Sequence, residues 1–286
     1  MMAVTNRDDL AHLPLAEREY VEAVSDVLKN TLGDKLAGLY LFGSATSNAY
    51  QPGVSDIDIA AVITSTFPEC TYLDLTSRLS HTALPCPARK LEFVLYTQES
   101  ARNLETRQNS HFPFPYELNF NSSEGIKDYL DLANKGGGQS EHWFVLDIAS
   151  GRYLGKALYG TDVKETFAEP DWTTVQRAIS SGIWWYRRKV SQITRNEKLT
   201  PPPTVEEEKE IIDAVLNACR GWRWTETEVW GSKIEGAEWA CEFNKTWPVI
   251  VKAMEVRRTG SGMIDGLEAA KFLHYVQGAL PGPTHL

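Results

Sequence analysis

The apolar residues in the first third of the chain fall into one long amphipathic segment and several short continuous runs. Over residues 15–31 they recur every third or fourth position, the spacing of one helical face. The short runs read as buried strands, and they cover residues 36–42, 56–63 and 91–96. A further helix is predicted near residues 71–81. Because strands and helices alternate, this part of the chain is predicted to be α/β.

The pattern changes in the second half of the chain. Residues 123–134 have helical spacing, and the KGGGQS stretch at residues 135–140 predicts a flexible break. Beyond it the pattern is helical almost throughout, and most tryptophans lie there at spacings that indicate packing. We therefore predict an α/β N-terminal domain over residues 1–150 and an all-α C-terminal domain over residues 151–286.

Composition narrows the possible partners. The chain has 286 residues, 42% of them hydrophobic, and a formal net charge of -9. This charge disfavours a nucleic-acid partner and suits a small cationic acceptor better. No apolar run is long enough for a membrane span, and none has the form of a secretory segment. The four cysteines show no C-x-x-C spacing, so we expect a cytoplasmic protein without a metal–thiolate site. We also expect the protein to be a monomer.

A glycine–serine pair ends the first predicted strand. Gly43 and Ser44 follow the apolar run at residues 36–42 and would open a turn or a helix. Backbone N–H groups exposed in such a turn can hold a phosphate. Taken alone, a Gly-Ser pair at a strand end is usually only a turn.

Three carboxylates fall on two of the predicted strands. Asp56 and Asp58 are two positions apart, so they share one face of their strand. Two like charges this close favour a cation between them, and carboxylate oxygens suit Mg²⁺ with a nucleoside triphosphate. Glu92 begins the next strand, where it could ligate the metal or accept a proton from an attacking hydroxyl. Each acid alone could be a solvated strand residue, but together with the Gly-Ser turn they predict a nucleotidyl-transfer site.

Two capping boxes mark helix starts in the second domain. Thr204 with Glu207, and Ser232 with Glu235, have the required spacing. Lys233 would then be the first residue of its helix, where the macrodipole disfavours a cation. A bound phosphate would remove this conflict, whereas a mobile, solvated lysine would give the same sequence.

The helix that Thr204 opens carries a stripe of acidic residues. Glu206, Glu210 and Asp213 fall at positions i, i+4 and i+7, and Arg220 lies seven residues further along the same face. The stripe could attract a cationic acceptor, or it could be a solvated helix face.

These motifs resemble one known family, the aminoglycoside 3''-adenylyltransferases of the streptomycin and spectinomycin type. The resemblance is tight over LFGSA at residues 41–45, SDID at residues 55–58 and Leu91-Glu92, and it returns over residues 216–239. Enzymes of this family join a polymerase-β-like nucleotidyltransferase domain to an α-helical domain. The resemblance therefore implies the same two-domain architecture, with the active site in the cleft between the domains.

The resemblance also implies roles for the matching residues of the first domain. Asp56 and Asp58 would hold Mg²⁺, and Glu92 would be a metal ligand or the catalytic base. The turn at Gly43 and Ser44 would contact the triphosphate of ATP.

In the helical domain, Arg220 and Lys233 match positions that contact the triphosphate. Glu206 and Glu210 fall where the family uses aspartates to bind the ammonium and guanidinium groups of the drug. We therefore expect ATP as co-substrate and a small cationic acceptor.

Two departures from the family concern the acceptor. Ser123 stands where the family has a drug-contacting tryptophan, and residues 180–200 offer no aligned counterpart of a second one. We expect Mg²⁺-dependent transfer of AMP from ATP to a hydroxyl of an aminoglycoside-like or other small cationic acceptor. The alternatives are the same chemistry on an endogenous metabolite, a protein or RNA, or a nucleotide-binding module without turnover.

Overall fold

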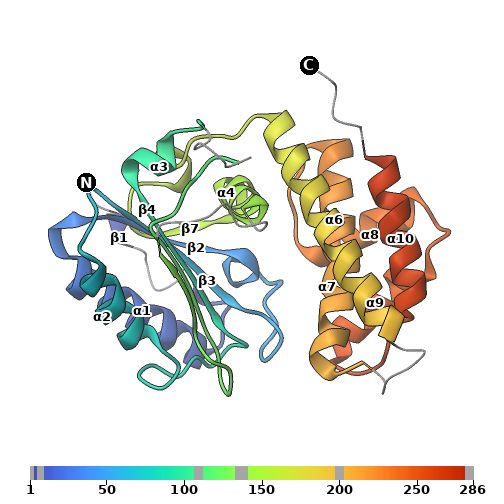
Figure 1. Cartoon of the computed structure of the whole chain (residues 1–286), viewed down its shortest axis with the longest axis horizontal. Helices are drawn as coiled ribbons and strands as arrows, with labels where there is room; N and C mark the ends of the chain where they lie inside the picture. The colour runs from blue at the N-terminus through green and yellow to red at the C-terminus, as the bar shows by residue number, and fades with distance from the viewer. Residues whose placement is uncertain (1–2, 5–9, 106–111, 133–140, 197–202, 281–286) are drawn as a thin grey trace. The chain divides into compact units, whose positions relative to one another are not determined.

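The computed structural model describes residues 3–4, 10–105, 112–132, 141–196 and 203–280. The chain divides into two compact units, residues 1–170 and residues 171–286 (Figure 1). No helix among the described residues has the length and apolar character that crossing a membrane requires.

The first unit is built on a mixed β-sheet. In the described part of the chain it has seven strands in the order β1-β7-β2-β3-β4-β5-β6. Only β3 and β4 pair in parallel, and the other neighbours are antiparallel. The strands are β1 (Ala3–Val4), β2 (Leu36–Phe42), β3 (Ile57–Ile63), β4 (Leu91–Thr97), β5 (Leu118–Ser122), β6 (Tyr129–Leu132) and β7 (Lys156–Gly160).

Short and long helices connect these strands. They are α1 (Leu15–Leu32), the 3₁₀ helices η2 (Gly33–Lys35) and η3 (Gly43–Thr46), α2 (Glu69–Leu79), α3 (Gln98–Arg102), α4 (His142–Leu154) and α5 (Val163–Thr166). The predicted helices at 15–31 and 71–81 correspond to α1 and α2, and the three predicted strands correspond to β2, β3 and β4.

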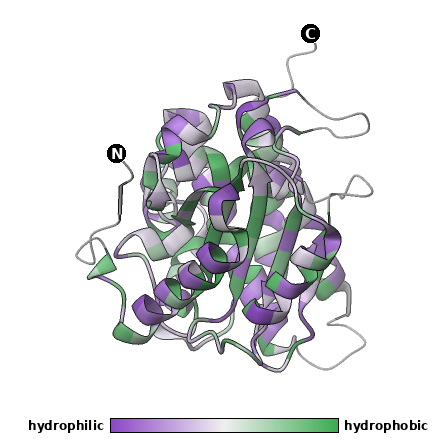
Figure 2. Ribbon diagram, turned by 90° about the vertical axis from the view of Figure 1, so that its left-hand side faces the viewer, coloured by the Kyte–Doolittle hydropathy of each residue, from purple (hydrophilic) through white to green (hydrophobic). Residues whose placement is uncertain are grey.

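One face of the sheet forms the main hydrophobic core with α1 and α2. Side chains alternate along each strand, so Ile57 and Ile59 of β3 and Leu91 and Phe93 of β4 all point into this core. In Figure 2 the strands are largely green, and the helices in front of them carry both colours, as amphipathic helices do. The residues between these positions must therefore face the other side of the sheet.

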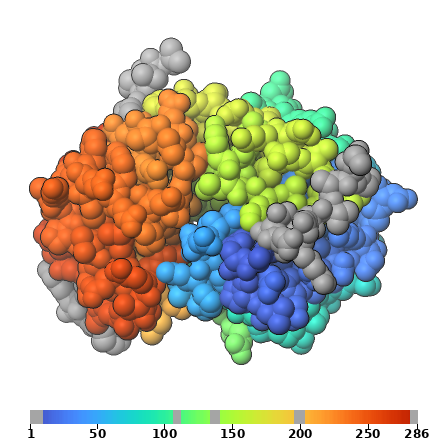
Figure 3. All heavy atoms as spheres, turned by 180° about the vertical axis from the view of Figure 1, so that it is seen from behind, coloured from blue at the N-terminus to red at the C-terminus, as the bar shows by residue number. Residues whose placement is uncertain are grey.

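The opposite face is covered over β2 by an aromatic cluster. The Phe167 ring packs against those of Tyr40, Phe42 and Tyr96, at centroid distances of 5.5, 6.0 and 5.5 Å. Helix α4 packs on β2 and η3, and Figure 3 shows its yellow-green surface beside the lighter blue surface that follows β2. At the start of β3 and β4 this face carries the polar side chains of Asp58 and Glu92, and β5 adds Asn121 opposite Glu92.

Residues 123–134 were predicted to be helical, and this prediction is wrong for the described residues. Residues 123–128 form a turn, and β6 pairs antiparallel with β5, with Tyr129 opposite Asn121. Ile126, Tyr129 and Leu130 do have helical spacing, but pairing with a distant strand decides the structure. The predicted break at residues 135–140 lies outside the described residues.

Residues 151–170 were assigned to the helical domain, but the structure places them in the first unit. They contain β7, which pairs with β2 through Ala157 opposite Tyr40.

The second unit is helical. Its described helices are α6 (Trp172–Asn196), α7 (Val205–Thr227), α8 (Lys233–Phe243), α9 (Pro248–Thr259) and α10 (Gly266–Ala279). Trp222 is central to its core and makes edge-on contacts with Trp239, Phe243 and Tyr275. Both predicted capping boxes are confirmed, one beginning α7 and the other α8.

Candidate active site

The carboxylates of Asp58 and Glu92 lie side by side on the polar face of the sheet. The parallel pairing of β3 with β4 sets Asp58 directly opposite Glu92. Both residues alternate with core residues, so both side chains point away from the core. Asp56 comes immediately before β3, two positions from Asp58. The structure thus brings together the three acids that the sequence singled out.

A lysine lies among these acids, and the sequence analysis did not identify it. The Lys90 Nζ is 3.8 Å from Asp56 Oδ2 and donates a hydrogen bond to Glu92 Oε1. Burial alone would lower the pKa of Lys90, but Glu92 and then Asp56 outweigh it and raise that pKa above the ordinary value. Lys90 is therefore a cation at the site. Its spacing of two residues from Glu92, on one strand face, is the sequence signal that could have revealed it.

Asp58 is the acid most affected by its neighbours. Desolvation of its carboxyl group, followed by the charges of Glu92, Asp56 and Asp147, raises the pKa of Asp58 well above its ordinary value. A hydrogen bond between the carboxyl groups of Asp58 and Glu92 acts in the same direction. Asp147 comes from α4 and is a fourth carboxylate that sequence spacing alone did not connect to the site.

Gly43 forms one wall of the site. Its φ is +65°, and a Cβ atom at this position would be 2.0 Å from Asp58 Oδ2. Gly43 begins η3, and Ser44 follows it with a half-buried side chain. The short helix is fixed by a hydrogen bond from Thr46 Oγ1 to Gly43 O (2.8 Å) and by His12 Nε2, which donates to Ala45 O (2.9 Å). The Gly-Ser turn and the acids are thus neighbours, as the predicted site requires.

The donor atoms suit a divalent metal ion such as Mg²⁺, although the acids do not converge as a metal cage. No group of three or more His, Cys, Asp or Glu side chains within the described residues is arranged to hold a metal. The carboxylates of Asp56, Asp58 and Glu92 nevertheless supply the hard oxygen ligands that Mg²⁺ prefers. Two of them already contact a cation, the Lys90 ammonium group. The site therefore fits Mg²⁺ in donor chemistry and in charge.

In the second unit, Lys233 is engaged by an aspartate. Its Nζ donates to Asp213 Oδ1 at 2.6 Å, and Arg257 Nη1 donates to the same oxygen at 3.3 Å. Desolvation lowers the pKa of Lys233, and the nearby Asp213 opposes this effect without cancelling it. The helix-start conflict expected for Lys233 is thus relieved by Asp213, a member of the acidic stripe.

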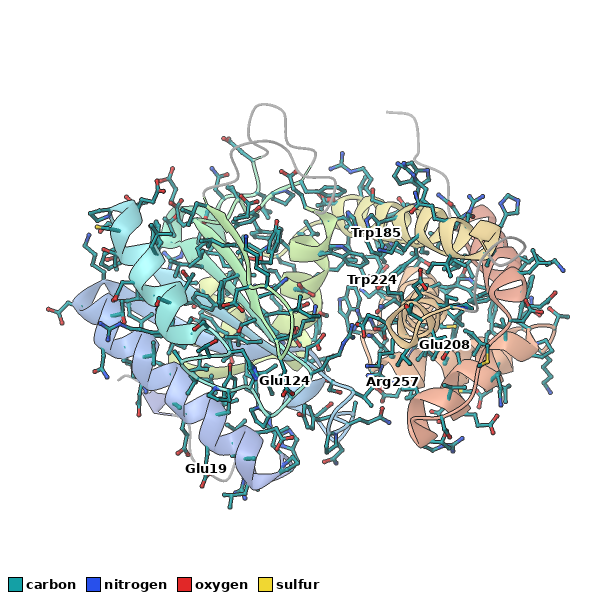
Figure 4. All side chains as sticks on the ribbon, turned by 60° about the horizontal axis from the view of Figure 1, so that its bottom comes forward. Glu19, Glu124, Trp185, Glu208, Trp224 and Arg257 are labelled. Atoms are coloured by element: carbon teal, nitrogen blue, oxygen red, sulfur yellow. The ribbon has the colours of Figure 1, made fainter. Side chains whose placement is uncertain are left out.

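Arg220 belongs to the same cationic group. Its charge and that of Arg257 both lower the pKa of Lys233. Helices α7 and α8 approach each other closely at Gly236. A Cβ atom at this position would lie only 2.7 Å from Arg220 Cα. Arg257 on α9, marked in Figure 4, is largely buried and was not identified from the sequence. Lys233 and Arg257 therefore contact the Asp213 carboxylate, and Arg220 is close enough to Lys233 to lower its pKa.

The other members of the acidic stripe also contact lysines. Glu206 pairs with Lys209 at 3.5 Å, and Glu210 Oε1 lies 3.3 Å from Lys189 Nζ. Lys189 in turn lies over the ring of Trp185, which Figure 4 labels on α6. Glu210 Oε2 is buried and has no hydrogen-bond partner among the described residues. The stripe is thus partly neutralised, and Glu210 retains one oxygen for a further donor.

Comparison with known proteins supports the resemblance at a coarser level. No protein-family model matches the chain. It is 22% identical to spectinomycin 9-adenylyltransferases of Staphylococcus aureus, strains Mu50 and N315 among them. The alignment spans 219 residues, 75% of this chain and 74% of the relatives. The similarity is to aminoglycoside adenylyltransferases in general and does not support the 3'' type specifically.

A solved structure shows the same fold. It is a spectinomycin adenyltransferase from Enterococcus faecialis, determined with ATP and spectinomycin. The match has a TM-score of 0.64 at 16% identity and covers 92% of this chain and 98% of that one. The chain has the fold of a spectinomycin adenyltransferase. The prediction of a nucleotidyltransferase-like α/β part with a helical part is confirmed at this level.

Proposed function

We propose that this protein transfers AMP from ATP to a hydroxyl group of a small aminoglycoside-like acceptor. The observation that carries the proposal is the pairing of Asp58 with Glu92 across β3 and β4, with Asp56 two residues before and Gly43 against Asp58. Carboxylates gathered in this way can hold a metal ion, and the metal ion stabilises the negative charge that develops on phosphate during transfer. The similarity to spectinomycin adenylyltransferases in sequence and fold supports the same chemistry.

In this proposal Asp56, Asp58 and Glu92 hold the metal ion. When bound, Mg²⁺ would neutralise charge on the phosphates and on the leaving pyrophosphate. Glu92 would accept the proton of the acceptor hydroxyl at a carboxylate oxygen, which leaves that hydroxyl oxygen able to attack the α-phosphorus in line.

We assign the phosphates of ATP to the turn at Gly43 and Ser44 and to Arg220 and Lys233. Lys233, Arg257 and Arg220 outnumber the single carboxylate of Asp213 at this spot, and a polyphosphate would balance the remaining positive charge. Lys233 would then exchange part of its contact with the Asp213 carboxylate for a contact with phosphate.

We assign a cationic group of the acceptor to Glu206 and Glu210. Glu210 supports this assignment because its Oε2 is buried without a hydrogen-bond partner among the described residues. An ammonium group that donates to this oxygen would satisfy it. Spectinomycin, on which the relatives act, is therefore the first acceptor to test, and streptomycin, with a hydroxyl of the 3'' type, is the second.

The test is an assay of the purified protein with ATP, Mg²⁺ and each acceptor. Pyrophosphate release and the mass of the acceptor are measured together, because only their coincidence shows AMP transfer. Asp58→Asn should lose the activity, while Asp74→Asn, which changes an exposed acid paired with Arg78 on α2, should keep it. If AMP is transferred only to an endogenous metabolite, the proposed AMP transfer is correct and the proposed aminoglycoside-like acceptor is wrong. If the protein binds ATP but releases no pyrophosphate from it with any acceptor tested, the proposal is contradicted.

A further inference from the structure

Lys90 is held at the acidic site by its backbone as well as by its side chain. It directly precedes β4, and its carbonyl oxygen accepts a hydrogen bond from the Ile57 N–H at 2.9 Å. One residue earlier, the Arg89 N–H donates to Ser55 O at 3.1 Å. These two bonds align the chain before β4 with the chain that carries Asp56. The position of Lys90 beside Asp56 and Glu92 therefore follows from strand pairing.

The ammonium group of Lys90 contacts two of the carboxylates that are proposed to bind the metal ion. Lys90 Nζ contacts Asp56 Oδ2 at 3.8 Å and also contacts Glu92 Oε1. The three side chains are only 21–34% exposed, so solvent screens their charges incompletely. Neighbouring partly buried carboxylates need a compensating cation to remain ionised together. The flexible four-carbon side chain of a lysine can place its ammonium group between the carboxylates and can also move it away from them.

We propose that Lys90 is an internal cation that neutralises Asp56 and Glu92 in the absence of metal and competes with a divalent metal ion for these carboxylates. The metal in this inference rests on the proposed function, whereas the role of Lys90 as a counter-ion rests on the contacts alone. It follows that the protein without metal is stabilised by Lys90. It also follows that metal binds weakly until a nucleotide contributes further oxygen ligands.

The test compares Lys90→Met with Lys35→Met. Lys35 lies in the same unit, is also half-buried, and places its ammonium group 4.4 Å from the Phe67 ring centroid and 3.0 Å from Thr66 O. Both substitutions remove one positive charge, but only one removes it from the acidic site. Binding of Mn²⁺ without nucleotide is measured by calorimetry, and thermal unfolding is measured in EDTA. We expect Lys90→Met to bind Mn²⁺ at least about tenfold more tightly than either wild type or Lys35→Met. We also expect it to melt at a lower temperature than Lys35→Met in EDTA and to regain that loss with Mn²⁺.

A second variant covers the case in which Lys90→Met does not fold. Lys90→Gln has a similar length and remains polar, so it removes the charge with less disturbance. Folding of either variant in Mn²⁺ but not in EDTA would also support the proposal. Unchanged or weaker Mn²⁺ binding, or an unchanged melting temperature in EDTA, would overturn it.

Wild type with ATP and Mn²⁺ separates this inference from the proposed function. If wild type binds Mn²⁺ only with ATP and Lys90→Met behaves as wild type, the inference about Lys90 fails and the metal site stands. If neither protein binds Mn²⁺ with ATP, the metal site and the competition both fail.

Discussion

Gly43 and Asp58 are so close that a side chain on Gly43 would collide with the carboxylate of Asp58. The distance from an added Cβ to Asp58 Oδ2 would be 2.0 Å, and the backbone of Gly43 has a φ of +65°. The preceding residue, Phe42, pairs with Asp58 across β2 and β3. The pairing of β2 with β3 therefore places the turn at Gly43 directly against the Asp58 carboxylate, where only a glycine fits.

Gly43→Ala should consequently damage the site beyond the effect of backbone strain. The methyl group would displace the Asp58 carboxylate, so we expect AMP transfer to fall by more than about tenfold, or about 1.4 kcal/mol in barrier height. Stability should fall by about 1–3 kcal/mol, as measured by urea unfolding. Gly53→Ala is the matched control, because Gly53 has a φ of +72° with no atom within 4 Å of the added Cβ. Equal losses in the two variants would show that the contact with Asp58 has no importance.

The raised pKa of Asp58 predicts a pH-dependent stability. Desolvation first, and then the charges of Glu92, Asp56 and Asp147, raise this pKa in the folded state. The folded protein therefore holds the proton more firmly than the unfolded chain does. The resulting stability is fully present below the ordinary Asp pKa of 3.8 and is lost as the pH rises through the raised value.

Asp58→Asn imitates the protonated acid and should stabilise the protein in EDTA near pH 8, by about 0.5–2 kcal/mol. The gain should shrink as the pH falls toward about 4, where wild type is itself protonated. Urea unfolding at several pH values measures this, with the exposed Asp74→Asn as control. A gain that does not change with pH would rule out the raised pKa as its cause.

Glu92→Gln should separate chemistry from binding. The amide keeps the shape of the side chain but cannot accept the hydroxyl proton, so kcat should fall by about 10²–10⁴-fold. Affinity for ATP, measured by calorimetry without acceptor, should change little. Loss of ATP binding with a normal kcat at saturation would instead show that Glu92 is only a ligand or a structural residue and is not the base.

Glu210→Gln tests whether the acidic stripe binds the acceptor. Loss of a charge-assisted contact worth about 1.5–3 kcal/mol should raise the acceptor KM roughly tenfold or more and leave ATP affinity unchanged. Lys189→Met is the informative control, because it removes the partner of Glu210 and keeps the carboxylate. If Glu210 binds a cationic acceptor, this control should leave KM equal or lower it. A wild-type acceptor KM in Glu210→Gln would show that Glu210 does not bind the acceptor.

The helices and strands that could be predicted from the sequence are those whose hydrophobic pattern fits only one type of secondary structure. The apolar runs of β2, β3 and β4 are too continuous for a surface helix, and their order placed Gly43, Asp58 and Glu92 at neighbouring positions. Residues 123–134 could not be assigned in this way, because their spacing suits a helix and β6 alike. Pairing with β5 decides between them, and β7 likewise depends on pairing with β2.

The spacing of charged residues predicted which of them share a helix or strand face, but it did not predict their ion-pair partners. Asp213 was grouped with Glu206 and Glu210 by helical spacing, yet its partners Lys233 and Arg257 come from two other helices. Lys90 acquires its role because Ile57 N–H pairs with its carbonyl oxygen. Such contacts arise only when distant segments meet, so spacing within one segment does not reveal them.

The most direct test of the acidic site as a nucleotidyl-transfer centre is the rate of AMP attachment to the acceptor in Asp56→Asn. Asp56 lies outside the regular strand, so the variant should keep the fold, as circular dichroism and melting can verify. The assay follows acceptor mass and pyrophosphate release with ATP, Mg²⁺ and spectinomycin, or the acceptor that wild type modifies. We predict turnover to be abolished in the folded variant. A rate within about tenfold of wild type, a barrier change below about 1.4 kcal/mol, would contradict the assignment of this site.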